Sequence, residues 1–138
     1  MTATGRKYVR QHKIGARELG LNAVTLAATR TSSSFAMTSY EQLTAEVNMS
    51  SQNTVTRVDI YMEVSNDSGT TWFRPQSKSI ASGAATLWDL VYRKTVSDAD
   101  QWLINFPINY ELGRLVVSVG AGTGSATDIV SVDLTLGA

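Results

Sequence analysis

Few residues of this chain have the types and spacing that catalysis or metal binding requires. His12 is the single histidine, so one chain cannot supply two histidine ligands, and a Ser-His-Asp site would need it held near a serine. Asp98 and Asp100 stand two residues apart and could bind calcium with oxygens from Asp67 or Asp128. Because calcium takes about six to eight oxygen ligands, a solvated turn is the simpler interpretation. We therefore expect no enzyme activity, no metal and no cofactor.

The most specific local motif runs from Ser65 to Trp72 and reads Ser-Asn-Asp-Ser-Gly-Thr-Thr-Trp. It matches the Asp-box pattern of sialidase-type β-propellers, in which the box folds a hairpin and does not catalyse. Asp67 can accept hydrogen bonds from turn amides, and Gly69 can adopt the positive φ that the turn needs. A propeller would need several copies and a much longer chain. We predict a structural hairpin built by Ser65, Asp67, Gly69, Thr71 and Trp72.

Two further patterns have both a binding and a structural interpretation. The glycine-rich run at 120–125 superficially resembles a phosphate-binding loop, but no Lys-Ser/Thr pair follows it, so a hairpin tip is expected. Trp72, Trp88 and Trp102 could form a stacking platform for sugars, although Trp102 alternates with core positions. Carbohydrate binding through Trp72 and Trp88 is therefore kept as an alternative.

The elements that must position these residues read as strands. Apolar residues recur at every second position in five segments: 43–49, 58–64, 102–108, 115–119 and 130–136. We expect further strands at 21–29, 72–74 and 86–96, a loop at 77–85 and a glycine-rich hairpin loop at 120–127. About eight strands, with turns roughly every 8–12 residues, predict an all-β antiparallel sandwich. Strand count alone leaves jelly-roll and immunoglobulin-like topologies open.

Length and composition bound the domain organisation. The 138 residues fit one domain, and without cysteine there is no disulfide framework and no thiolate zinc site. Apolar runs fall far short of the roughly 20 residues that cross a bilayer, so we expect no membrane contact. Residues 1–20 are polar and lack an apolar period, which predicts an extended arm. The sandwich domain is expected at 21–138.

Charge separates the arm from the body. The first 17 residues carry five basic residues and no acid, while the remaining 121 residues hold seven basic and twelve acidic residues, a net charge of −5. Opposite signs favour contact between the arm and an acidic protein surface, its own or a neighbour's, over contact with nucleic acid. Our candidate partner contacts in the arm are Arg6, Lys7, Tyr8, Arg10, Lys13 and Arg17.

Three segments together carry a resemblance to a known class of proteins. They are the hairpin 58–72 (VDIYMEVSNDSGTTW), the strand 102–108 (WLINFPI) and the pair of strands 112–132 (LGRLVVSVGAGTGSATDIVSV). The series resembles small virion proteins of tailed bacteriophages, whose short β-sandwiches decorate, cement or connect capsid and tail parts. The resemblance covers about residues 40–138 and includes no motif that separates capsid from tail.

This resemblance implies a structural function in a virion assembled in the host cytoplasm. It implies a capsid decoration or cement protein that bridges neighbouring shell subunits, with the major capsid protein or other virion proteins as partners. It also implies a homo-oligomer, with a trimer favoured, and an arm that reaches neighbouring subunits. The alternative is a carbohydrate- or receptor-binding sandwich of a tail fibre or baseplate.

Overall fold

The computed structural model describes residues 11–14, 21–38, 40, 42–81, 84–107 and 110–137, with the side chains of 11–14, 77–81, 84–89, 107 and 137 left undescribed. In this part of the chain all regular structure is β. The strands are β1 (Gln11–Ile14), β2 (Leu21–Thr25), β3 (Arg30–Thr31), β4 (Phe35–Ala36), β5 (Gln42–Ser51), β6 (Val55–Ser65), β7 (Gln76–Ala81), β8 (Ala84–Asp89), β9 (Tyr92–Thr95), β10 (Asp100–Pro107), β11 (Leu112–Gly122) and β12 (Ile129–Gly137).

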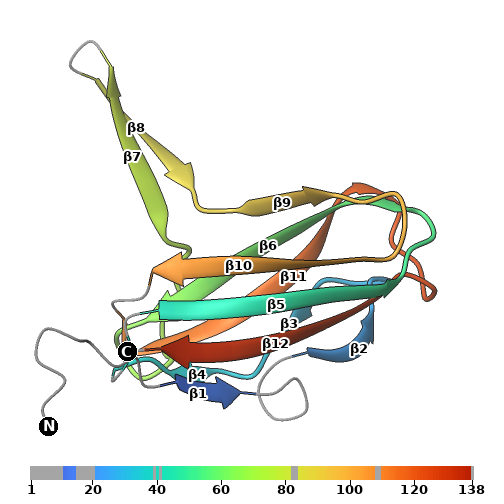
Figure 1. Ribbon diagram of the computed structural model, residues 1–138. Helices are drawn as coiled ribbons and strands as arrows, with labels where there is room; N and C mark the ends of the chain where they lie inside the picture. The colour runs from blue at the N-terminus through green and yellow to red at the C-terminus, as the bar shows by residue number, and fades with distance from the viewer. Residues whose placement is uncertain are drawn as a thin grey trace, which may run out of the picture.

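Most strands form two antiparallel sheets packed face to face (Figure 1). Sheet A has the order β2-β12-β5-β10, and β1 pairs with β12 beside β2. Sheet B has the order β3-β11-β6-β9, and β4 pairs with β11 beside β3. From β9 to β12 each successive strand crosses to the opposite sheet. This order of two four-stranded sheets is the jelly-roll arrangement, so the expected all-β sandwich is confirmed and the choice of topology is settled.

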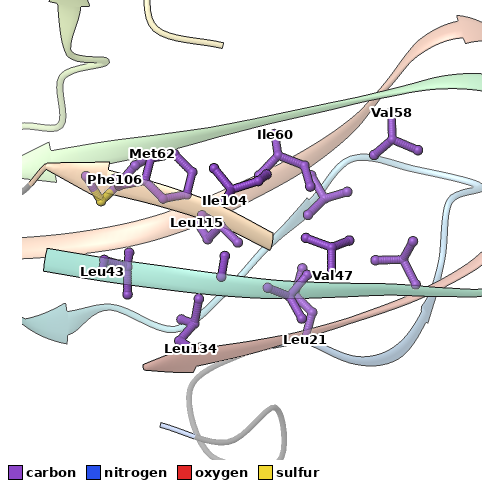
Figure 2. Close-up of a cluster of buried hydrophobic side chains, with 14 of the residues drawn as sticks. Leu21, Leu43, Val47, Val58, Ile60, Met62, Ile104, Phe106, Leu115 and Leu134 are labelled. Atoms are coloured by element: carbon purple, nitrogen blue, oxygen red, sulfur yellow. The ribbon is translucent and has the colours of Figure 1, made fainter. Parts of the chain in front are cut away.

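The core fills the space between the two sheets (Figure 2). Period-two alternation places one face of each strand inside, because successive side chains of a strand point to opposite faces. The segments 43–49, 58–64 and 130–136 bury every second residue, as predicted. The largest fully buried side chains are Leu26, Met37, Leu43, Met49, Ile60, Leu115, Leu134 and Leu136.

Four local predictions were wrong. The segment 77–85, expected as a loop, lies in the hairpin β7–β8, with a register from Gln76↔Asp89 to Ala81↔Ala84. The expected strand 86–96 is two strands in different sheets, because the chain leaves β8 after Asp89 and enters β9 at Tyr92. The return strand 72–74 is a single bridge between Val64 and Phe73, and β2 ends at Thr25. Small residues carry little hydrophobic pattern, so local sequence did not reveal these boundaries.

Part of the expected arm belongs to the sandwich. Residues 11–14 form β1, which extends sheet A by pairing with β12 from Gln11↔Gly137 to Ile14↔Leu134. Lys13 therefore lies in a strand at the edge of sheet A. The other candidate arm contacts lie outside the described residues, namely Arg6, Lys7, Tyr8, Arg10 and Arg17. Within the described part of the chain, no helix is long and apolar enough to cross a membrane.

Candidate functional site

The hairpin β7–β8 projects beyond the sandwich at the upper left of Figure 1 and forms a separate two-stranded sheet. Its root is fixed where the two strands meet the body. The amide of Leu90 donates a hydrogen bond to the carbonyl of Pro75 at 3.0 Å. Beside them, the Arg74 guanidinium lies 3.6 Å from the centre of the Tyr61 ring. A small apolar gap at the root is lined by Met62, Pro75, Leu90, Tyr92 and Phe106. The root is therefore held by the sandwich, and the ribbon extends from it.

A two-stranded ribbon alone is marginally stable in water, because it has no second layer to bury an apolar face. The sequence of β7 and β8 includes Ile80, Leu87 and Trp88 and has two charged residues, Lys78 and Asp89. A low-charge ribbon with large apolar residues is suited to burial against another surface. No strand of sheet A or sheet B is its pairing partner in the described structure.

Among the described strands, β10 is the outermost strand of sheet A and pairs with β5 alone. Its alternation turns Ile104 and Phe106 into the core, while Leu103 faces outward with 66% of its surface exposed. A shallow depression at this edge is formed by Glu46, Gln101, Trp102 and Leu103. The edge thus offers an exposed leucine beside unpaired strand backbone.

Side chains of β9 contact β10 at two points. The Tyr92 hydroxyl donates a hydrogen bond to the carbonyl of Asn105 at 3.2 Å. Lys94 lies 3.5 Å from a carboxylate oxygen of Asp100, and its ammonium is 5.9 Å from the centre of the Trp102 ring. These contacts hold the two edge strands together at their ends and leave Leu103 between them.

The Asp-box residues form a compact hydrogen-bonded turn after β6. The Ser65 hydroxyl donates to Asp67 Oδ1 at 2.8 Å and accepts the amide of Gly69 at 2.9 Å. Asp67 Oδ1 also accepts the amide of Thr71 at 2.8 Å, and Gly69 has a φ of 89°. Hydrogen bonds from the amide and hydroxyl of Thr71, and from the hydroxyl of Ser65, lower the pKa of Asp67 to about 2. Ser65, Asp67 and Thr71 therefore hold the turn together.

The tryptophans whose side chains are described do not share a surface. The Arg114 guanidinium lies 4.1 Å from the centre of the Trp72 ring and 2.9 Å from Glu63 Oε1. Since β6 and β10 run in the same direction in Figure 1, Trp72, beyond the end of β6, and Trp102, near the start of β10, lie toward opposite ends of the sandwich. The side chain of Trp88 is outside the description. Trp72 and Trp102 therefore provide no common sugar platform.

The aspartates considered for calcium are also dispersed. Asp128 is fully buried, and Asp100 pairs with Lys94. Asp98 accepts a hydrogen bond from the amide of Ala99, and Asp67 serves the Asp-box turn. No three acidic, histidine or cysteine side chains gather into a possible metal site among the described residues.

The run at 120–125 is shared between the end of β11, at Gly122, and the loop after it.

Sequence reasoning missed the two features that define this candidate site. Strand β7 has no alternating hydrophobic pattern, and the expected strand 86–96 covered only the second part of β8 and continued into β9, so no local signal identified the hairpin. Leu103 carried a usable signal, because the alternation of Trp102, Ile104 and Phe106 already placed it on the outer face. An outward leucine identifies an apolar surface, but only the sheet order shows that its strand is an edge.

No family model matches this chain, and no curated protein matches it in sequence. Among solved structures it is similar to the SPBc2 prophage-derived protein YomS, with a TM-score of 0.55 and 14% sequence identity. The similarity covers 96% of this chain and 97% of that one. At this identity the likeness establishes a shared fold over nearly the full length of both chains.

Proposed function

We propose that this chain is a non-enzymatic structural protein of a bacteriophage that bridges neighbouring subunits of the virion as a capsid decoration protein. The observation that carries the proposal is the projecting hairpin β7–β8, a low-charge ribbon with no strand partner in the described sandwich. Such a ribbon gains stability by burial against another subunit. The prophage origin of the similar protein YomS supports a phage source.

The mechanism is attachment at many equivalent positions. A rigid jelly roll presents the hairpin and the basic arm to different neighbours, and each contact can be weak. On a lattice, simultaneous contacts raise the effective concentration of each partner, so weak contacts add up to firm attachment. Attachment to assembled subunits stabilises the shell by linkage, since the protein binds the assembled state.

The test is to isolate particles from a strain that encodes this chain and to locate the chain by mass spectrometry and immunogold electron microscopy. We expect a fixed number of copies of this chain per shell subunit, and gold label distributed over the capsid. Label confined to the tail would move the function to a tail fibre or baseplate. Absence of the chain from purified particles would overturn the proposal.

A further inference from the structure

We propose that the outer edge of β10 receives the hairpin β7–β8 of a second copy of this chain, so that copies join head to tail. The inference rests on the proposed function and identifies the neighbour as another copy. Its physical basis is that, among the described strands, one molecule carries both a ribbon that pairs with neither sheet A nor sheet B and a long edge strand whose middle is uncharged.

Edge strands normally carry features that prevent pairing with other chains, such as charge, proline, bulges or short length. In sheet B, the edge strand β9 has four residues and includes Arg93 and Lys94. The edge strands β1 to β4 have two to five residues each. Strand β10 has eight residues, and its segment 101–106 contains neither charge nor proline. Its charge, Asp100, and its proline, Pro107, stand only at the two ends, so among the described strands at sheet edges β10 is the long one with an unprotected middle.

The backbone at this edge is suitably oriented. The Asn105 carbonyl accepts a hydrogen bond from Tyr92, on the side away from β5. In an antiparallel strand the amide and the carbonyl of one residue face the same side, and residues two apart face that same side. Leu103 therefore also turns its amide and carbonyl away from β5. The amide of Gln101 bonds the Asp100 carboxylate at 2.8 Å, which leaves Leu103 at the centre of the available edge.

The hairpin fits this edge in length and charge. Each of its strands has six residues, which equals the length of the uncharged segment 101–106. Glu46 lies directly opposite Leu103 in the register of β5 and β10, and the hairpin brings Lys78 as its one cation. Pairing by strand addition would supply main-chain hydrogen bonds, and Leu103 would be covered by the ribbon.

The hairpin comes from another molecule because, in its own molecule, it projects away from the sandwich (Figure 1). A hairpin on one surface that binds an edge on another makes a heterologous contact. Contacts of this kind close into rings or continue as filaments, depending on the rotation between copies. A closed ring of three would agree with the trimer that the resemblance to phage virion proteins implies.

Two variants separate the two halves of the contact. In the first, residues 76–89 are replaced by Asn-Gly, so that Pro75 and Leu90 become the ends of a four-residue turn and keep their 3.0 Å hydrogen bond. In the second, Leu103→Lys places a charge on the open edge. Phe73→Lys is the matched control, because Phe73 is 62% exposed and lies beside sheet B. Circular dichroism and unfolding curves verify that all three variants fold.

Solution mass is then measured by sedimentation over a range of concentrations. Wild type and Phe73→Lys should form the same oligomer, and each of the other variants should associate at least about tenfold more weakly. Mixing the hairpin-less variant with Leu103→Lys should give a one-to-one dimer and nothing larger, since the mixture has one intact hairpin and one intact edge per pair.

Three results would overturn the inference: a wild type that is monomeric at all concentrations, unchanged association of Leu103→Lys, or no dimer in the mixture. Incorporation into particles is scored separately. A chain found on the capsid but monomeric in solution would overturn the copy-to-copy contact and leave the virion function standing.

Discussion

The buried carboxylate of Asp128 accepts a hydrogen bond from the backbone amide of Asn53 at 2.6 Å. The same side chain accepts the Ser125 hydroxyl at 2.6 Å and the amide of Val55 at 3.3 Å. It thereby joins the turn between β5 and β6 to the loop that precedes β12. A single aspartate supplies acceptors to a turn that would otherwise leave backbone amides unpaired.

Replacing Asp128 should therefore destabilise the fold. Asp128→Ala removes the acceptor and leaves the buried amide of Val55 and the part-buried amide of Asn53 unsatisfied, so the free energy of unfolding should fall by about 3 kcal/mol. Urea denaturation followed by tryptophan fluorescence measures this change. Asp98→Ala, in an exposed turn, is the control and should change stability by less than about 0.5 kcal/mol. Equal effects of the two substitutions would show that the buried hydrogen bonds contribute nothing specific.

Stability should decrease in acid. Burial raises the pKa of Asp128, but hydrogen bonds from Ser125 and from the amides of Asn53, Val55 and Thr54 outweigh burial and hold it below its usual value. The pKa of Asp67 is likewise lowered from 3.8 to about 2. Because both carboxylates have a lower pKa in the folded state, the unfolded chain binds protons at these positions more readily. The stabilisation that the two carboxylates provide is therefore complete above pH 3.8 and is lost as the pH falls toward 2.

The measurement for this prediction is the free energy of unfolding between about pH 6 and about pH 2, compared among wild type, Asp67→Asn and Asp128→Asn. This range covers most of the roughly pH 5 to 1 window of acid destabilisation. Each variant loses one carboxylate with a lowered pKa, so its stability should depend less steeply on pH than that of wild type. If both variants keep the full acid dependence of wild type, other groups are responsible for it.

Two glycines with positive φ should differ in how strictly they are required. Gly69 has a φ of 89°, and an added Cβ would lie 3.6 Å from Trp72, an ordinary contact. Gly122 has a φ of 82°, but its added Cβ would collide with the Thr54 carbonyl and the Thr56 amide. Gly69→Ala should cost about 1 kcal/mol and Gly122→Ala about 3 kcal/mol, because only the second adds a backbone collision to the strained φ. Thermal unfolding compares them, and equal losses would contradict the collision.

The arm should divide into two functional parts. Deleting residues 1–10 retains β1, so the free energy of unfolding should stay as in wild type while attachment to the virion weakens. Deleting residues 1–20 also removes the pairing of β1 with β12 and should cost about 2 kcal/mol. Urea denaturation and a particle-binding assay on both truncations separate the effects. Unchanged attachment of both truncations would remove the arm from the proposed contacts.

How much of this structure the sequence predicts depends on whether the signal is local. Alternation at 43–49, 58–64 and 130–136 identifies the buried faces, because a strand between core and solvent repeats every two residues. The pairing of β12 with β5 joins segments far apart in the chain, and no local pattern specifies it. The same limit applies to the candidate site. The contacts of Asp67 and Gly69 follow from turn chemistry, whereas the open edge at Leu103 depends on the order of strands in sheet A.

Removing the hairpin should leave the jelly roll intact. The Asn-Gly replacement of residues 76–89 keeps the Leu90–Pro75 hydrogen bond and the Arg74–Tyr61 contact, and it removes a sheet that pairs with neither of the others. The free energy of unfolding, measured by urea at a concentration where wild type is monomeric, should change by less than about 0.5 kcal/mol. A loss of several kcal/mol would mean that the ribbon packs on its own sandwich, and it would then be unavailable to a second copy. An unchanged value means that the ribbon contributes nothing to the monomer, as expected for an element whose partner is another subunit.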